Sequence, residues 1–395
     1  MAEPYRILTL NSISALGLKR FPAGRYVVGN HVEDPDAILV RSHDMHAMYL
    51  PARVRTIGRA GAGVNNIPVA KLSRRGVPVF NAPGANANAV KELVIAGMLI
   101  AARNLTPAMK FVEGLQGDDK TVDKKVEDGK KHFAGLELPR HVLGVIGLGK
   151  VGSLVADTAI KLGMDVLGYD PEITVDAAWS LPSQVRKAGS MEEVLKASDF
   201  VTLHVPLLDI TRGMINADRI KLMKKNAILL NFSRDGIVDN DAVLQALDAK
   251  HLRSYVCDFP ARKLIDHPQV IALPHLGAST REAEDNCAIM VVEQVRDFIE
   301  NGNILNAVNF PDVVMARESP YRVGIANANV PNMVGQISTA MANARINIHN
   351  MINKSRGDMA YTVLDVDSPV PQDVIARIRE IEGVLSVCYL PREAQ

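Results

Sequence analysis

Val142-Leu143-Gly144-Val145-Ile146-Gly147-Leu148-Gly149-Lys150-Val151-Gly152 is the segment that indicates how the middle of this chain folds. It is an apolar run that passes directly into the pattern G-x-G-x-x-G, and a helical pattern follows. Gly147 permits a tight turn, Gly149 lets the backbone approach a pyrophosphate, and Gly152 lets the helix pack close to the strand. Phosphates would then meet the helix N-terminus, where free N–H groups favour an anion. The stretch therefore predicts a dinucleotide-binding strand and helix.

A carboxylate follows at the spacing that such a motif requires. Asp170 stands eighteen residues after Gly152, at the end of the next expected strand. A carboxylate there would accept a hydrogen bond from the ribose 2′-OH and repel a 2′-phosphate, which favours NAD over NADP. The simpler alternative is a glycine-rich turn with a solvated Asp170. The dinucleotide-binding interpretation is favoured, because a strand, the glycines, a helix, a second strand and the aspartate follow one another within about thirty residues.

Short apolar runs alternate with helical patterns on both sides of this motif, which is typical of parallel α/β sheets. The strands expected before the motif are 6–10, 37–40, 53–57 and 78–80, and those from the motif onward are 142–146, 165–169, 200–204, 227–232, 255–258 and 270–272. Long helices are expected over 86–103 and 282–300, and a solvated helix or insertion over 113–135. The C-terminal segments 321–326, 333–344, 346–352, 359–366, 371–381 and 384–390 follow a βαββαβ order. That order suggests a small ferredoxin-like domain.

Composition excludes several classes of protein. The 395 residues carry 45 Lys+Arg and 44 Asp+Glu, so the net charge of +1 lacks the basic excess of nucleic-acid binders. Hydrophobic residues at 47% and charged residues at 23% are ordinary globular values, which argues against disorder. We expect two or three domains.

Three cysteines, Cys257, Cys287 and Cys388, lie far apart, and their odd number does not suit a disulfide framework. The N-terminus lacks a secretory pattern and no apolar run approaches the length of a membrane span. We expect a soluble, cytoplasmic protein with no membrane partner and no nucleic-acid partner.

Three loops after the motif end strands of the same expected sheet, and ligands of such folds bind at the carboxyl ends of the strands. These loops are 204–207, 231–236 and 274–280. Arg234 offers a planar fork that matches a carboxylate, and His275 can take and return a proton near neutral pH. The pair suits a 2-oxo acid dehydrogenase, although each alone could be a surface arginine or a helix-capping histidine. No G-x-S-x-G elbow and no zinc-ligand spacing is present, so we expect no metal site.

Taken together, these loops resemble the D-isomer-specific 2-hydroxyacid dehydrogenase family, and within it the branch that acts on 3-phosphoglycerate. The resemblance covers nearly the whole chain. Its motifs are 61–66, 81–86, the glycine motif, the Arg234 and His275 loops and 308–311. It implies a flavodoxin-like substrate domain (1–103 with 282–311), a Rossmann NAD domain (104–281) and a C-terminal ACT domain (319–395). The fold class is therefore α/β, with two doubly wound parallel-sheet domains and a ferredoxin-like βαββαβ domain.

The resemblance also implies an activity and a set of site residues. The activity is reversible oxidation of 3-phosphoglycerate by NAD to 3-phosphohydroxypyruvate, the first step of L-serine biosynthesis, in a homodimer or homotetramer. Arg234 and His275 would be catalytic, and Asp258 would meet the nicotinamide amide. The other cofactor residues would be Gly147, Gly149, Lys150, Val151, Gly152, Asp170, His204, Val205, Pro206, Phe232, Ser233, Gly277 and Ala278. Arg41 and Ser42 would hold the substrate phosphate, and the amides of Ala62, Gly63 and Val64 its carboxylate.

One departure from the family concerns the acid partner of the histidine. The family usually places a glutamate shortly after the strand that ends at Asp258, and this chain has Arg262 and Lys263 there. Without a carboxylate partner the imidazolium is less favoured and the tautomer less fixed. Asp258 or Asp266 could substitute, or His275 could act without a dedicated acid.

The C-terminal segment resembles an ACT domain, a module that often binds amino acids across a dimer interface. Asn329 and Asn347 occupy its ligand-loop positions, so L-serine is an expected effector. The family's turn glycine is Asn332 here and its upstream histidine is Asn327. Asparagine can adopt the positive φ that the turn needs. A plain dimerisation module is the alternative.

Two other functions stay open. One is a reductase of an unphosphorylated acid such as glyoxylate or hydroxypyruvate, which Arg41 and the ACT-like segment argue against. The other is a non-catalytic NAD(H)-sensing binding protein, which the missing glutamate favours and the intact Arg234 and His275 disfavour.

Overall fold

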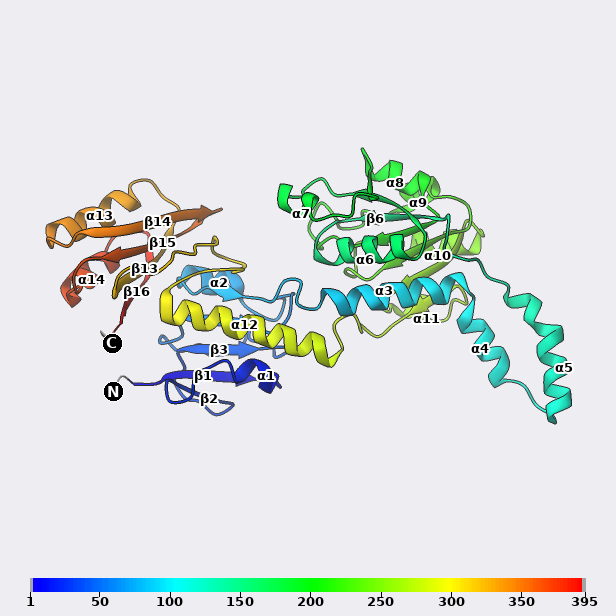
Figure 1. Ribbon diagram of the computed structural model, residues 1–395, viewed down its shortest axis with the longest axis horizontal. Helices are drawn as coiled ribbons and strands as arrows, with labels where there is room; N and C mark the ends of the chain where they lie inside the picture. The colour runs from blue at the N-terminus through cyan, green and yellow to red at the C-terminus, as the bar shows by residue number, and fades with distance from the viewer. Residues whose placement is uncertain (1–2, 393–395) are drawn as a thin grey trace. The chain divides into compact units, whose positions relative to one another are not determined.

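A computed structural model describes residues 3–392, and its contacts divide the chain into two compact units (Figure 1). Residues 1–86 and 281–395 form the first unit, and residues 87–280 form the second. Within the described residues, no helix is both long enough and apolar enough to cross a membrane.

The first unit contains a five-stranded parallel sheet in the order β2-β1-β3-β4-β5. This is the flavodoxin-like doubly wound order. Its strands are β1 (Tyr5–Leu10), β2 (Tyr26–Gly29), β3 (Ala37–Val40), β4 (Thr56–Arg59) and β5 (Val79–Phe80). The helices of this part are α1 (Ala15–Leu18), α2 (Val69–Arg74) and α12 (Arg281–Asn301).

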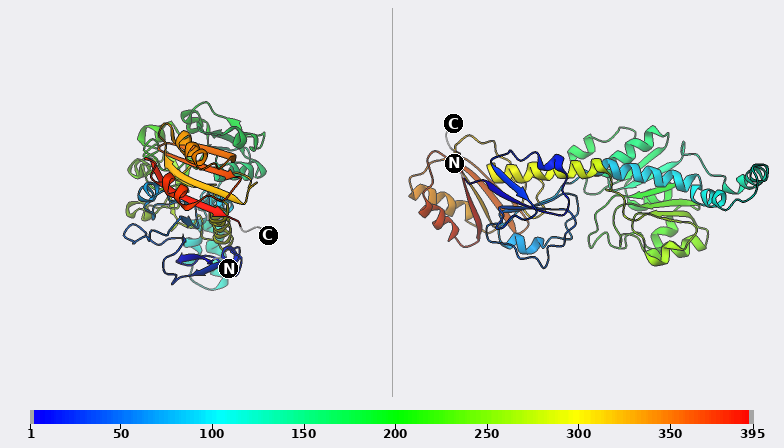
Figure 2. Two further views of the ribbon diagram at one scale, coloured as in Figure 1. Left: turned by 90° about the vertical axis from the view of Figure 1, so that its left-hand side faces the viewer. Right: turned by 90° about the horizontal axis from the view of Figure 1, so that it is seen from below.

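Helix α12 returns the chain to this sheet from far along the sequence, as Figure 2 also shows. Val291, Val292 and Val295 are fully buried in the same core as Ile7 and Leu39. Two glycines allow the close approach. A Cβ on Gly17 would lie 2.6 Å from the carbonyl carbon of Ala288 on α12, and one on Gly58 would lie 2.8 Å from the Val291 and Val295 side chains.

The C-terminal part of the first unit is a four-stranded antiparallel sheet, β14-β15-β13-β16, with two helices. Its elements are β13 (Tyr321–Ala328), α13 (Met333–Asn343), β14 (Ile348–Arg356), β15 (Met359–Val366), α14 (Gln372–Arg379) and β16 (Val384–Pro391). The βαββαβ prediction is confirmed. Arg322 and Asp365 form a fully buried pair, with Nε–Oδ1 2.6 Å and Nη2–Oδ2 2.8 Å. Burial opposes ionisation of Asp365, but the bonds from Arg322 outweigh it and hold the pKa of that carboxyl below its usual value.

The second unit is built on a seven-stranded parallel sheet in the order β12-β11-β10-β9-β6-β7-β8, the Rossmann order with an added strand. Its strands are β6 (Val142–Ile146), β7 (Asp165–Tyr169), β8 (Arg186–Lys187), β9 (Phe200–Leu203), β10 (Ala227–Asn231), β11 (Leu252–Cys257) and β12 (Val270–Ala272). Its helices are α3 (Ala87–Ala102), α4 (Leu105–Glu113), α5 (Asp119–Gly129), η1 (Lys130–Phe133), α6 (Lys150–Lys161), α7 (Val175–Trp179), α8 (Met191–Ala197), α9 (Ala217–Leu222), α10 (Asn240–Asp248) and α11 (Arg262–Ile265).

The fold class predicted from sequence is confirmed, with a few local differences. Helix α3 was expected to belong with residues 1–103, but it packs on the seven-stranded sheet, where a Cβ on Gly97 would meet Phe232 and Val256 at 2.9 Å. Strands β2 and β8 were not predicted. Both lie at sheet edges, and β8 is two exposed residues, so no apolar pattern marks it.

The close approach at Gly17 gives a stability prediction. We expect Gly17→Ala to lower the free energy of unfolding by about 2 kcal/mol, because the added methyl meets the backbone of α12, which cannot move aside. The higher helix propensity of alanine offsets at most about 1 kcal/mol of this loss. Denaturant unfolding measures the difference. Gly29→Ala is the matched control, since the nearest atom to its Cβ would be 3.6 Å away, and equal stability of the two variants would contradict the prediction.

Candidate active site and nucleotide-binding loop

The glycine motif joins β6 to α6 with the geometry that the sequence predicts. Gly147 has φ +92°, and a Cβ there would lie 2.6 Å from the carbonyl oxygen of His204 on the neighbouring loop. A Cβ on Gly152 would lie 1.9 Å from the carbonyl oxygen of Gly147. A Cβ on Gly149 would meet no atom within 4 Å, and no side chain caps the helix that begins at Lys150. The loop thus leaves open space before uncapped helix amides, which fits a pyrophosphate.

Asp170 lies at the end of β7, beside this loop. Its Oδ2 accepts a hydrogen bond from the Leu148 backbone N–H at 2.8 Å, and its Oδ1 accepts from Glu172 N–H at 3.0 Å. The carboxylate is half-buried and is therefore held against the glycine loop. Lys150 and Val151 begin α6 directly after Gly149, with Lys150 exposed and Val151 half-buried.

The loops after β9 and β10 are tied together. The Ser233 hydroxyl donates to the carbonyl of Val205, and Pro206 follows exposed to solvent. His204 Nε2 lies 2.9 Å from Thr202 Oγ1, and desolvation lowers the pKa of its imidazole to about 3. This ring is therefore neutral at physiological pH and cannot serve as a cation. Phe232 is buried in the core under α3.

Arg234 lies in the loop after β10 and is half-buried. Its Nη1 donates to the Ser233 carbonyl at 2.7 Å, and its own carbonyl accepts from Asn231 Nδ2 at 3.0 Å. No carboxylate of the described residues pairs with its guanidinium, so the charge is free to meet an anion.

Asp258 connects this loop to the His275 loop. Its backbone N–H donates to the Asn231 carbonyl at 3.1 Å, and its carbonyl accepts from the His275 N–H at 3.1 Å. Its carboxylate is buried and accepts from the N–H groups of Leu276 at 2.7 Å and Gly277 at 2.8 Å. Because β10, β11 and β12 are neighbours in the sheet, Arg234, Asp258 and His275 all follow adjacent carboxyl ends.

His275 has a left-handed backbone, with φ +57°, and an exposed side chain. Its ring lies 5.0 Å from the Phe259 ring, centroid to centroid. Neither candidate acid partner is directed at it by a hydrogen bond. Both oxygens of Asp258 accept from backbone amides, and exposed Asp266 pairs with Arg262 at 3.0 Å. Ala278 follows Gly277 half-buried.

The first unit carries the residues predicted to hold the substrate. Gly61 has φ +153°, and Ala62, Gly63 and Val64 follow it half-buried in the loop after β4. The Ala62 carbonyl accepts from Asn81 Nδ2 at 2.6 Å. In this unit Arg41 Nη2 also lies 2.6 Å from Glu284 Oε1 of α12.

Ser42, Asn329 and Asn347 each take part in a hydrogen bond between a backbone group and a side chain. The Ser42 N–H donates to Asn11 Oδ1 at 3.1 Å. Exposed Asn329 donates from Nδ2 to the Gly357 carbonyl at 3.0 Å, and the Asn347 N–H donates to Asp367 Oδ1 at 3.2 Å. Asn332 adopts φ +66°, so the positive φ expected at the glycine position of this turn is present.

Sequence reasoning missed Asn231, Asn11 and Glu284. The side chain of Asn231 makes two hydrogen bonds that shape the Arg234 loop. Its only sequence signal is its position at the end of a buried strand. Asn11 and Glu284 lie 31 and 243 residues from their partners, so no local pattern could reveal them. Residues 3–392 contain no group of three or more His, Cys, Asp or Glu side chains placed to hold a metal ion.

The fold and these loops define a dinucleotide-binding α/β protein. Its polar loops follow the carboxyl ends of neighbouring strands in the seven-stranded sheet. Residues 95–277 match the model of the D-isomer specific 2-hydroxyacid dehydrogenase, NAD binding domain. The D-3-phosphoglycerate dehydrogenase of Haemophilus influenzae is 32% identical over 336 residues, which cover 82% of this chain and 78% of that protein. The chain belongs to the D-isomer-specific 2-hydroxyacid dehydrogenase family.

A second relative carries the same name, and a solved structure has a similar fold. The D-3-phosphoglycerate dehydrogenase of Methanocaldococcus jannaschii is 35% identical over 347 residues, or 85% of this chain. The matched part spans 62% of the length of that relative. The crystal structure of the TT0316 protein from Thermus thermophilus has a TM-score of 0.65 and 26% identity, covering 77% of this chain and 99% of that one.

The contacts of Asp258 give a prediction about the His275 loop. We expect Asp258→Asn to speed amide hydrogen exchange at Leu276 and Gly277, because an amide offers one acceptor oxygen where the carboxylate offers two. The free energy of unfolding should fall by about 1–3 kcal/mol. Exchange followed by mass spectrometry reports the loop, and Asp266→Asn is the control on an exposed carboxylate. Unchanged exchange in Asp258→Asn would show that the carboxylate does not hold the loop.

Proposed function

We propose that this protein is an NAD-dependent dehydrogenase that reversibly oxidises 3-phosphoglycerate to 3-phosphohydroxypyruvate, the first step of L-serine biosynthesis. The observation that carries the proposal is the placement of Arg234, Asp258 and His275 after three neighbouring strands of the dinucleotide-binding sheet. Relatives named D-3-phosphoglycerate dehydrogenase over most of this chain support the choice of substrate.

Arg234 binds and orients the substrate in this proposal. Its guanidinium has no carboxylate partner among the described residues, so it offers a free planar fork to the carboxylate and the C2 oxygen of the substrate. The bond from Nη1 to the Ser233 carbonyl and the bond from Asn231 hold the loop while the substrate binds. A positive charge beside C2 also stabilises the oxygen as its bond order changes.

His275 takes the proton of the C2 hydroxyl in oxidation and returns it in reduction. Asp258 acts as a positioning residue, since its carboxylate holds the two amides that follow the histidine. In this proposal His275 works without a dedicated acid side chain. The left-handed backbone, rather than a carboxylate partner, then directs the ring.

NAD is the cofactor, and it supplies the hydride acceptor when bound. Gly147, Gly149 and Gly152 provide the cradle, and the uncapped amides at Lys150 and Val151 meet the pyrophosphate. Asp170 is held beside the loop and selects the unphosphorylated ribose. His204, Val205, Pro206, Phe232, Ser233, Asp258, Gly277 and Ala278 complete the lining.

The first unit supplies the substrate-binding part. The amides of Ala62, Gly63 and Val64 take the substrate carboxylate, and Arg41 and Ser42 take its phosphate. Arg41 would exchange its bond to Glu284 for the phosphate. The domains are then residues 1–86 with 281–311 for substrate, 87–280, which include α3, for NAD, and 319–395 as the ACT domain.

Turnover of 3-phosphohydroxypyruvate with NADH tests the proposal. We expect strong preference for it over hydroxypyruvate, preference for NADH over NADPH, and a loss of kcat/KM of about 10²–10³-fold in Arg234→Ala. Arg186→Ala, an exposed arginine on the edge strand β8, is the control and should retain activity.

Two results would redirect the proposal. Equal turnover of hydroxypyruvate would indicate a reductase of unphosphorylated acids. NADH binding without turnover of either acid would favour an NAD(H)-sensing binding protein, which the engagement of both Asp258 oxygens by amides would then explain.

The C-terminal domain is proposed to bind L-serine through Asn329 and Asn347, in a homodimer or homotetramer. Both side chains are exposed, and the turn at Asn332 has the required positive φ. Self-association is supported by exposed Met109 and Val112 on α4. A cytoplasmic location is proposed from the three free cysteines.

Equilibrium dialysis with serine checks the effector proposal. We expect saturable binding with a dissociation constant at or below about 1 mM, weakened at least tenfold in Asn347→Ala. The exposed Asn343→Ala, on α13, is the control. Absence of binding at millimolar serine would leave the domain as a dimerisation module.

A further inference from the structure

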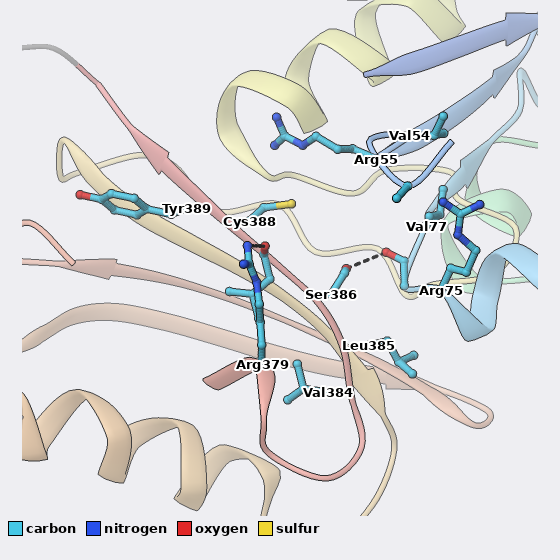
Figure 3. Close-up of a pocket in the computed structure, with 13 residues that line it drawn as sticks. Val54, Arg55, Arg75, Val77, Arg379, Val384, Leu385, Ser386, Cys388 and Tyr389 are labelled. Atoms are coloured by element: carbon cyan, nitrogen blue, oxygen red, sulfur yellow. Dashed lines mark hydrogen bonds between the residues drawn. The ribbon is translucent and has the colours of Figure 1, made fainter. Parts of the chain in front are cut away.

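The first unit contains a cavity of about 650 Å³ whose walls come from distant parts of the chain (Figure 3). One wall is formed around Arg55, just before β4, and around the turn from Arg75 to Val77 that follows α2. The other wall is β16 and the end of α14. The walls meet where the Ser386 hydroxyl donates to the Gly76 carbonyl at 2.8 Å.

Three arginines line this cavity, and no acidic residue lines it. Arg75 donates to the carbonyls of Leu50 and Pro51 at 3.0 and 2.7 Å, and Arg379 donates to the Val387 carbonyl at 3.3 Å. These acceptors are neutral, so neither positive charge is compensated. No carboxylate of residues 3–392 lies in ion-pair contact with any of the three guanidinium groups.

Arg55 differs from the other two, because its side chain lies beside the Cys388 thiol and makes no hydrogen bond to a carbonyl oxygen in the part of the chain that the structure describes. Its Nε is buried and has no hydrogen-bond partner among the described residues. Arginine stays protonated in proteins, so this charge cannot be removed by titration. A buried unpaired charge is costly unless a counter-ion compensates it. Arg322, which is fully buried, shows how such a charge is usually compensated, because Asp365 pairs with it through two bonds.

The position of the cavity separates it from the proposed substrate loops. Arg55 precedes β4 and Val77 precedes β5, so the cavity lies at the amino ends of these parallel strands. The Ala62–Val64 loop follows the carboxyl end of β4, where ligands of such sheets bind. The cavity also contains neither Asn329 nor Asn347, the proposed serine residues.

We propose that this cavity is an effector site for a small metabolite that carries two or more negative charges on phosphate or carboxylate groups. Arg55 and Arg379 supply guanidinium donors to the charged oxygens. Arg75, whose Nη1 and Nη2 already bond the Leu50 and Pro51 carbonyls, adds an uncompensated positive charge. Val54, Val77 and Val384 line the cavity beside them and suit a short carbon skeleton. Since one wall leads into β4 and the other is β16, the bound anion joins the substrate-binding sheet to the C-terminal domain.

Cys388 lines the cavity and gives a local readout of occupancy. It is half-exposed, whereas Cys257 and Cys287 are buried, so a neutral alkylating reagent should react first at Cys388. The rate of its alkylation by iodoacetamide, followed by peptide mass spectrometry on the full chain, is measured with inorganic phosphate, pyrophosphate or citrate. Comparing phosphate and pyrophosphate with citrate distinguishes the two anion chemistries, and chloride at matched ionic strength is the salt control.

We expect saturable protection, with alkylation about tenfold slower when the anion is at about ten times its dissociation constant. Protection should persist in Arg74→Met, an exposed neighbour of Arg75 that does not line the cavity, and fall below about twofold in Arg55→Met and Arg379→Met. Arg379 is exposed, so its variant tests the proposal even if Arg55→Met does not fold.

Three outcomes would overturn the proposal. They are no protection by any of the anions at about 10 mM, equal protection by chloride, or full protection in Arg379→Met. The readout does not depend on turnover. Failure here therefore leaves the proposed dehydrogenase activity untouched, and absence of that activity leaves the effector site untouched.

Discussion

The bonds of Asp258 determine how the chemistry-bearing loops of the second unit are arranged. Its N–H reaches the end of β10, its carbonyl holds the backbone of His275, and its carboxylate takes the next two amides. The buried carboxylate compensates amides that would otherwise be unsatisfied in a turn with a left-handed residue. A single residue thus links the ends of β10 and β11 and the loop after β12. The same carboxylate makes no hydrogen bond to the imidazole ring of His275.

Close approach of backbone segments is the second constraint, and it recurs in both units. In the second unit, Gly152 lets α6 begin almost in contact with the Gly147 carbonyl, which brings the first helix amides close to the glycine loop. In the first unit, Gly17 and Gly58 let α12 lie against α1 and β4. The consequence in the first unit is topological, because a helix from residue 281 onward completes a core begun by residues 5–80.

Arginine side chains of the first unit fall into two groups, those paired with a carboxylate and those without one. Arg322 is buried with Asp365, and both oxygens of the carboxylate are used. Such a pair needs nothing further from solution. Arg55, Arg75 and Arg379 share a cavity without a carboxylate, and the carbonyl oxygens that two of them contact cannot neutralise them. This difference in pairing distinguishes Arg322, a paired arginine of the core, from the three arginines of the proposed effector site.

The amino-acid pattern alone predicts the sheet types, the glycine motif, the position of Asp170 and the loops that carry Arg234 and His275. These features are local, since each depends on periodicity or on residues only a few positions apart. Edge strands such as β8 left no pattern because they bury no face. Three-dimensional packing was needed to show that Asp258 binds amides 18 and 19 residues away, that Arg41 pairs with Glu284, and that Arg55 and Arg379 line one cavity. The physical reason is that partners of long side chains and buried charges are chosen by three-dimensional packing, which brings together residues that no sequence spacing relates.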